Sequence, residues 1–204
     1  MTRHSSIATR KIPLLAAVAL ASLALSGCIS IGDKTPKQLF RLSSVETEPA
    51  GTSTTGTISE AVVVLDPEAD RALDVMRVPV SLDASRVAYL KDALWVERPT
   101  RQFRSLLAET LRARTGRLVV EGGDFEVTGR TLIGGRLLQM GYDAPSRTVI
   151  VRFDAIRTER GGPITQRRFE SVVSNIEPKA AFVGPALNQA ANDVAKQVAD
   201  WAKT

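Results

Sequence analysis

RTVIVRFDAIR, residues 147–157, is the stretch that decides the fold. Apolar and polar residues alternate along it, with Val149, Val151, Phe153 and Ala155 on one face and Arg152 and Asp154 on the other. A period of two residues is typical of a β-strand that buries one face and exposes the other. Segments 129–142 and 164–174 flank this strand, and the turn-forming sequences DAPS (143–146) and RGGP (160–163) separate the three. We therefore predict an antiparallel meander of three strands with one buried face.

Two amphipathic helices are predicted, one before and one after this meander in the sequence. The first begins at Pro99, whose missing N–H is not needed at a helix start, and ends at Gly116. Its apolar stripe is Phe103, Leu106, Leu107 and Leu111. The second covers about 179–203, and Gly184-Pro185 is expected to delay its start or to kink it. Its stripe is Val183, Leu187, Ala190, Val194, Val198 and Trp201, and both stripes predict packing against the sheet.

Shorter strands are predicted upstream of the meander, at about 39–42, 61–65, 73–80, 86–91 and 118–120. The run AVVVL at 61–65, closed by Asp66-Pro67, is apolar at every position and predicts a strand buried on both faces. Segments 73–80 and 86–91 are expected to form a hairpin. Residues 44–59 are rich in Thr, Ser, Gly, Pro and Glu and predict a mobile loop. The predicted fold class is α+β: a mostly antiparallel β-sheet with two amphipathic helices packed on one face.

The N-terminus has the order of features of a lipoprotein signal peptide. Residues 1–11 carry basic side chains and no acidic one, and residues 12–25 are nearly all apolar over a length too short for a comfortable membrane span. The sequence Leu25-Ser26-Gly27-Cys28 then resembles the lipobox of bacterial lipoproteins. This resemblance implies cleavage after Gly27 and lipid attachment at Cys28. The alternative is an ordinary signal peptide with a chance cysteine.

The predicted organisation is a signal peptide over 1–27, the lipidated Cys and a tether over 28–37, and one domain over 38–204. Two or three acyl chains on one cysteine would hold the domain stably on the periplasmic face of a membrane. Ile29 stands where, in lipoproteins of this kind, an Asp tends to retain the protein in the inner membrane. We therefore expect the outer membrane, and the inner membrane is the alternative because sorting rules differ among bacterial groups.

Removal of the signal peptide also removes most of the reactive side chains. Three basic residues, Arg3, Arg10 and Lys11, leave with it, so the excess of basic over acidic residues falls from five to two, with no basic block typical of nucleic-acid binding. The only histidine, His4, leaves as well, and the only cysteine is Cys28. The sequence therefore predicts no catalytic residue, no cofactor and no Cys/His metal site. A chance pair of carboxylates, as in a glycosidase, is the remaining enzymatic alternative.

Three residues are candidates for partner binding: Arg77, Arg86 and Trp95. Arg77 and Arg86 belong to segment 67–87, which mixes arginines with Val and Met, a composition that suits an interface core. The alternative is a hairpin whose apolar side faces the domain core. Trp95 lies between a predicted strand and the Pro99 helix, so it is expected to cap their junction in the core. The competing interpretation is an exposed anchor for a partner.

The whole mature chain resembles the ABC-type transport auxiliary lipoprotein family. The resemblance lies in the lipobox, in Leu39-Phe40-Arg41-Leu42 with Leu39 where a tyrosine is common, and in the Val-rich strand Ala61 to Asp66. It continues with Ala93-Leu94-Trp95 before the helix, the three meander strands, and the Ala-rich terminal helix from Ala186 to Trp201.

The resemblance implies that the protein acts by associating with a transport system. It implies a non-enzymatic accessory component of an ABC/MCE-type lipid transport system between the inner and outer membranes. The implied partners are an MCE-domain protein and ABC or other integral membrane transport components, and a homo-oligomeric ring would suit docking on a symmetric conduit. The alternative functions are a lipoprotein activator or scaffold of the cell-wall synthesis machinery, for which the tether is short, and an enzyme acting on lipid or glycan.

Overall fold

Three long antiparallel strands form the predicted meander: β7 (Thr131–Asp143), β8 (Thr148–Glu159) and β9 (Ile164–Val173). The structure is a computed structural model that describes residues 38–122 and 129–203. The four apolar residues that alternate along β8 are all fully buried, so the prediction from their spacing is confirmed. Gly135 on β7 has φ +135°, and a Cβ there would lie 1.9 Å from the Asp154 carbonyl oxygen, so this close approach of two strands requires glycine.

The rest of the sheet is built around β7. Its other members are short: β1 (Gln38–Phe40), β2 (Val62–Val64), β3 (Glu68–Ala69), β4 (Arg77–Ser81), β5 (Val87–Trp95) and β6 (Val119–Glu121). β4 and β5 form the predicted antiparallel hairpin, whereas β2, β3 and β4 each pair with β7 in parallel. β2 lies between β6 and β7 and is buried at all three positions, as its apolar run predicts. The nine-stranded sheet is therefore mixed, with its longest ladders antiparallel.

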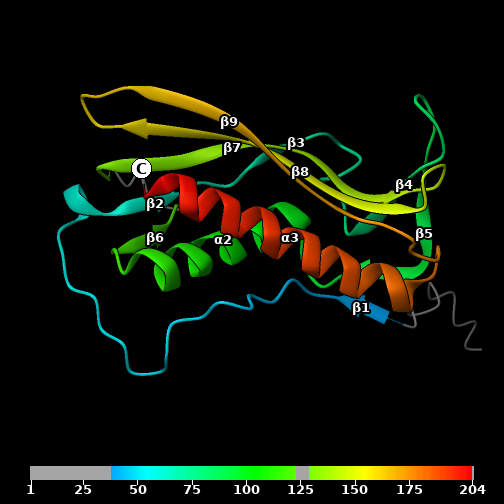
Figure 1. The fold of residues 1–204 in the computed structure, drawn as a ribbon, viewed down its shortest axis with the longest axis horizontal. Helices are drawn as coiled ribbons and strands as arrows, with labels where there is room; N and C mark the ends of the chain where they lie inside the picture. The colour runs from blue at the N-terminus through cyan, green and yellow to red at the C-terminus, as the bar shows by residue number, and fades with distance from the viewer. Residues whose placement is uncertain (1–37, 123–128, 204) are drawn as a thin grey trace, which may run out of the picture. The chain divides into compact units, whose positions relative to one another are not determined.

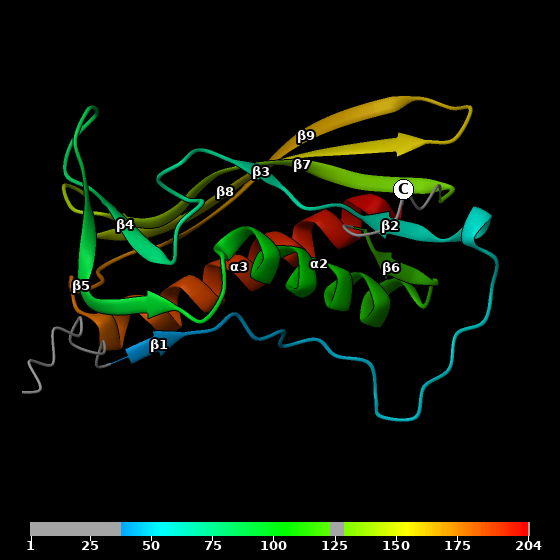
Figure 2. The ribbon, with the colours of Figure 1, turned by 180° about the vertical axis from the view of Figure 1, so that it is seen from behind.

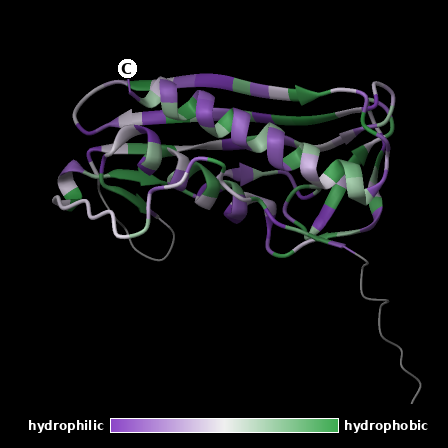
Figure 3. Ribbon diagram, turned by 60° about the horizontal axis from the view of Figure 1, so that its bottom comes forward, coloured by the Kyte–Doolittle hydropathy of each residue, from purple (hydrophilic) through white to green (hydrophobic). Residues whose placement is uncertain are grey.

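Two helices pack on one face of this sheet, as Figures 1 and 2 show from opposite sides. α2 (Pro99–Thr115) ends at Gly116, which has φ +63° and donates its N–H to the Arg112 carbonyl. α3 (Ala180–Ala202) continues through Pro185 and contacts α2, β8 and β9. Hydrophobic and hydrophilic residues alternate around both helices and along the strands (Figure 3), which is the pattern from which both layers were predicted.

Edge-to-face aromatic pairs join helix to sheet and strand to strand in the core. Phe103 of α2 lies 5.1 Å from Phe153 of β8, and Phe40 of β1 lies 5.8 Å from Trp95 of β5, measured between ring centroids. Within the described ranges, the buried apolar residues of this core fall between Phe40 and Ala202. Residues Pro36–Thr204 form one compact unit, so this unit contains its own complete hydrophobic core.

The segment after β1 is bound to the helices by its backbone. We call residues 42–48 the strap. Its amide groups at Leu42, Ser43, Val45 and Glu48 donate to side-chain oxygens of Gln102, Asn188, Asn192 and Glu109, over 2.8–3.0 Å. Residues 53–57 have no regular structure, and a short 3₁₀ helix, η1 (Ile58–Glu60), follows. The prediction of a loop is confirmed, but its first part is fixed on α2 and α3, contrary to the expectation of a mobile segment.

Candidate functional site

The residues predicted to carry the site fall in two places. The lipobox, Leu25 to Cys28, lies outside the described residues, so lipidation of Cys28 stays a prediction. The three candidates for partner binding all belong to the β4–β5 hairpin. This hairpin lies at one end of the sheet, and its turn extends away from both helices (Figure 1). The hairpin is therefore the candidate site in the part of the chain that the structure describes.

Trp95, at the end of β5, belongs to the core. Its side chain is 1% exposed and packs against Phe40, whose strand runs parallel to β5 beside it. Its backbone N–H donates to the Met76 carbonyl. This position is the junction of sheet and helix that the sequence predicted. A partner could reach the indole only after the core had opened, so the burial favours the packing role over the anchor role.

Arg77 lies at the base of the hairpin, and Arg86 lies at its turn. The Arg77 guanidinium stacks over the Tyr89 ring, 4.3 Å from the ring centroid. Arg86 is exposed and forms an ion pair with Asp83. The neighbours Val78 and Val80 point into the core. One side of the hairpin therefore packs on the domain, while both arginines stay on the surface, at separate points of the same element.

The Asp83 carboxylate organises the turn. It accepts hydrogen bonds from the backbone N–H groups of Ser85 and Arg86 at 2.9 and 2.8 Å, and from the Arg86 Nε at 2.5 Å. These hydrogen bonds lower the pKa of Asp83 below its ordinary value. The bond from the Ser85 backbone has the largest effect, and the bond from the Arg86 side chain has the next largest. The carboxylate is therefore ionised at neutral pH and can accept all of these hydrogen bonds.

Apolar side chains are exposed on this ordered turn. Leu82 is 41% exposed and Val87 is 54% exposed, on the two arms of the turn. A groove of about 170 Å³ runs beside Val87, between β4 and β7, and Pro79 and Leu138 contribute to its apolar lining. We call residues 82–87 the hairpin tip. It offers two apolar contacts and one arginine on a rigid support, which is the composition of a small protein-binding surface.

Leu82 and the groove were not singled out from the sequence. The only signal was Asp83-Ala84-Ser85, a turn sequence in which the Asp side chain can bind the backbone two residues on. The sequence identified segment 67–87 as a candidate interface, but it gave no way to tell the inward Val78 and Val80 from the outward Leu82. Leu82 lies two residues after Val80, so alternation alone would place it on the same inward face. It is exposed because it lies beyond the end of β4 at Ser81, in the turn of the hairpin.

Acidic side chains are the candidate metal ligands and ion-pair partners among the described residues. Among residues 38–122 and 129–203, no group of three or more His, Cys, Asp or Glu side chains could hold a metal ion. Most carboxylates there that lie near an arginine are ion-paired with it, for example Glu46 with Arg114 and Asp154 with Arg168. In the same part of the chain no helix is long and apolar enough to span a membrane.

Comparison with known proteins assigns the chain to a family. No curated protein matches it by sequence. The crystal structure of XCC0632 from Xanthomonas campestris has the same fold, with 15% sequence identity and a TM-score of 0.64, over 81% of this chain and 94% of that chain. The crystal structure of an uncharacterised protein also has this fold, with 11% identity and a TM-score of 0.63, over 80% of this chain and 97% of that chain. The PelC dodecamer from Paraburkholderia phytofirmans is more distant, with 11% identity and a TM-score of 0.42, over 72% of this chain and 91% of that chain. Residues 40–199 match the family described as ABC-type transport auxiliary lipoprotein component, and the chain therefore belongs to this family, as its sequence features suggested.

Proposed function

We propose that this protein is lipidated at Cys28, lies on the periplasmic face of the outer membrane, and docks through its hairpin tip on an MCE-domain protein of a lipid transport system. The coarser role follows from the family: the chain is an auxiliary lipoprotein component of ABC-type transport. Lipid as the cargo, the MCE partner and the outer membrane belong to the proposal. The protein would bind and position its partner in the transport system and would not catalyse a chemical step.

The observation that carries the docking proposal is the pre-ordered hairpin tip. Leu82 and Val87 would lose unfavourable exposure to water on contact with a partner. Because Asp83 already fixes the turn, binding would cost little conformational entropy there. Arg86 can add a contact at the rim of the same surface. These properties together support a role in recognition for a turn that extends away from the core.

Self-association into a ring is part of the same proposal. One hairpin tip is a small surface, and a single such contact would be weak. Several copies arranged around a symmetric conduit would bind it much more tightly, because each contact after the first forms at a high local concentration. The long strand β9 pairs only with β8, so its outer edge is free among the described residues for contact between copies.

Site-specific photocrosslinking in intact envelopes tests the docking surface. A photoreactive amino acid is placed at Leu82 and, as a matched control, at Val172, which is exposed to a similar extent but lies on β9. We expect crosslinks from position 82 to an MCE-domain protein, identified by mass spectrometry. Crosslinks from position 172 should give this chain itself or nothing.

The same experiment distinguishes the alternatives. A crosslink from position 82 to a cell-wall synthase would overturn the transport proposal in favour of the other function predicted from sequence. A crosslink to the MCE-domain protein from position 172 and not from position 82 would keep the partner and reject the hairpin tip.

A further inference from the structure

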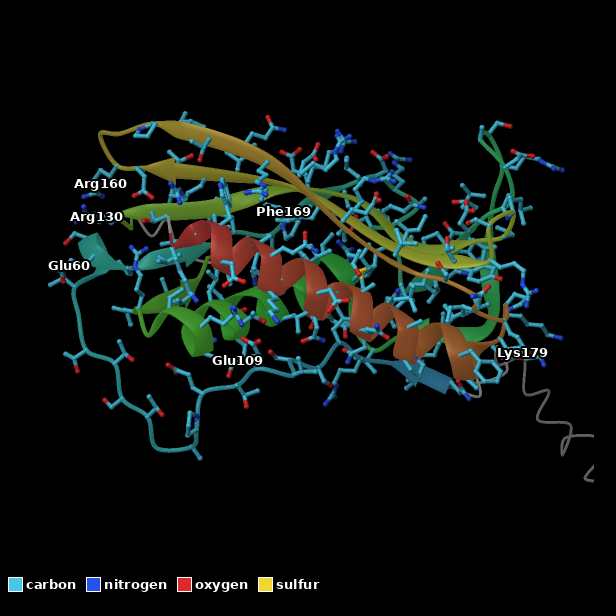
Figure 4. All side chains as sticks on the ribbon, viewed as in Figure 1. Glu60, Glu109, Arg130, Arg160, Phe169 and Lys179 are labelled. Atoms are coloured by element: carbon cyan, nitrogen blue, oxygen red, sulfur yellow. The ribbon has the colours of Figure 1, made fainter. Side chains whose placement is uncertain are left out.

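A second cleft lies at the other end of β7, far from the hairpin. β7 runs from Thr131, which lines this cleft, to Asp143, which pairs with Ser81 of β4, a span of about 40 Å of extended chain. The cleft has a volume of about 710 Å³. Figure 4 shows Glu60, Arg130 and Arg160 gathered at this end of the molecule. Basic side chains dominate its walls: Arg117, Arg130, Arg157, Arg160 and Lys203, against the two carboxylates Glu60 and Glu159.

Two of these arginines have no carboxylate partner in the described part of the chain. The Arg117 side chain donates one hydrogen bond, to the Thr131 hydroxyl at 3.2 Å. Arg130 forms no ion pair within 4 Å with a described residue. The pKa of the Glu60 carboxyl is lowered mainly by the hydrogen bonds that Glu60 makes with Thr57, and the charge of Arg130 lowers it further. The Glu60 carboxylate is itself occupied by the Thr57 backbone and hydroxyl groups.

Arg157 lies deeper in the same wall. Its Nη1 donates to the Trp201 carbonyl at 3.1 Å, while its buried Nε has no hydrogen-bond partner and lies 3.5 Å from a Glu159 oxygen. The guanidinium also lies over the Trp201 ring, 5.2 Å from its centroid. A guanidinium that is largely withdrawn from water and incompletely bonded keeps capacity for a further anionic contact.

Three arginines of α2 are, by contrast, fully paired with carboxylates. Arg104, Arg112 and Arg114 each contact two carboxylates, at 2.6–3.4 Å. Arginines without a carboxylate partner, such as Arg77, also occur elsewhere among the described residues, but at this cleft two of them line one hollow together with Arg157.

We infer that this cleft binds a phosphate group, presented by a molecule about the size of a phospholipid headgroup. Guanidinium groups match the oxygens of phosphate in geometry and in charge. The volume is in the range of small-molecule sites and much larger than a single phosphate ion needs. Ala202 and Gly162 are the only non-polar residues of the lining, so acyl chains would have to remain outside. The inference does not depend on the docking role of the hairpin, which lies at the opposite end of β7.

Binding measurements on the mature lipoprotein in neutral detergent micelles test the inference. Glycerol 3-phosphate and inorganic phosphate serve as soluble probes in calorimetric titrations, and phosphatidylglycerol mixed into the micelles serves as the lipid probe, read by native mass spectrometry. We expect binding of a phosphate probe that weakens as salt rises. The double variant Arg117→Gln/Arg130→Gln should bind about tenfold or more weakly, because two charge-assisted contacts are lost.

Matched variants and probes decide the outcome. Arg101→Gln removes one exposed arginine of α2 and should leave binding unchanged, and Arg130→Lys should keep part of it. Phosphatidylglycerol binding with no response to soluble phosphates would identify a lipid headgroup as the source, whereas equal responses would identify phosphate compounds in general. No binding of any probe at millimolar concentration, or equal loss in Arg101→Gln, would overturn the inference. The crosslinking result at Leu82 tests the docking proposal and is independent of these binding measurements.

Discussion

Trp95 is the residue whose removal should damage the fold most. It is the largest fully buried side chain and forms an edge-to-face pair with Phe40. Trp95→Ala would leave a large cavity, and we expect it to lower the free energy of unfolding by about 3–5 kcal/mol. Urea denaturation measures this loss. Trp201→Ala, at a half-buried ring against Phe169, is the control and should lose clearly less.

A different result for Trp95 would revive the competing interpretation. If Trp95→Ala unfolds at the same urea concentration as the wild type and still loses its partner in a pull-down, the indole acts as a binding anchor. The burial in the structure makes the first outcome the expected one.

Cys28 carries the second prediction at this scale. The lipobox resemblance predicts that Cys28→Ala loses metabolic palmitate labelling and no longer fractionates with membranes, because a cysteine thiol is the attachment point of the lipid. Retention of acyl label by Cys28→Ala would contradict the lipobox.

Asp154 should set part of the acid sensitivity of the fold. Two hydrogen bonds from Arg168, at 2.6 and 2.7 Å, hold the pKa of the Asp154 carboxyl below its ordinary value. A lowered pKa in the folded state means that the stabilisation is present above the ordinary pKa of about 3.9 and is lost as the pH falls through the folded-state pKa. Asp154→Asn should therefore cost about 1 kcal/mol or less at pH 7, since Arg168 is largely exposed.

Melting temperatures at pH 7 and pH 3 measure this effect. The difference between the two should be smaller in Asp154→Asn than in the wild type, and Arg168→Gln should reduce it in the same way. An unchanged difference in both variants would show that this pair makes no contribution.

At the scale of elements, the strap depends on one buried side chain of α3. Asn192 is 6% exposed; its Oδ1 accepts from the Val45 N–H and its Nδ2 donates to the Ser43 carbonyl, both at 2.9 Å. Asn192→Ala leaves these strap groups without a partner, and we expect a loss of about 1–3 kcal/mol. Amide hydrogen exchange at Val45 should become faster. Asn188→Ala removes a single strap bond, to Ser43, and should have the smaller effect.

Local patterns were sufficient to predict the long elements. The alternation in β8, the stripes of α2 and α3, and Gly116 at the end of α2 all lie within single segments, and the structure confirms each of them. The parallel pairing of β2 and β4 with β7 could not be predicted, because it joins segments about 60–70 residues apart. The strap was missed for the same reason: its partners, such as Asn188, lie far along the chain.

The two surface sites differ in how far the sequence could indicate them. The hairpin was a candidate because Arg77 and Arg86 are close to each other in the chain. The cleft at the start of β7 is assembled from Glu60 and from residues between Arg117 and Lys203, which come together only because β8 and α3 return to the start of β7. No spacing rule could have indicated it.

At the scale of the whole molecule, charge reversal tests whether the hairpin is an interface or only a structural element. Arg77→Glu and Arg86→Glu should lower the melting temperature only slightly, because both side chains are on the surface and the contacts that they lose, with Tyr89 and with Asp83, lie there as well. Binding to the MCE-domain protein in a pull-down should weaken about tenfold or more, and light scattering reports whether the mass of the assembly changes. A loss of stability with binding intact would assign both arginines to the fold alone.

The strap has a mechanical consequence for a domain held by its N-terminus. Traction transmitted along the chain would enter at β1, which has only three residues paired with β5 and alone would peel away from the edge of the sheet. Immediately beyond it, the strap bonds to α2 through Gln102 and Glu109 and to α3 through Asn188 and Asn192. The load would thus be divided between two helices that are packed against each other. With the proposed lipid anchor in place, detachment of the N-terminal segment would therefore require these bonds to break in addition to the β1–β5 pairing.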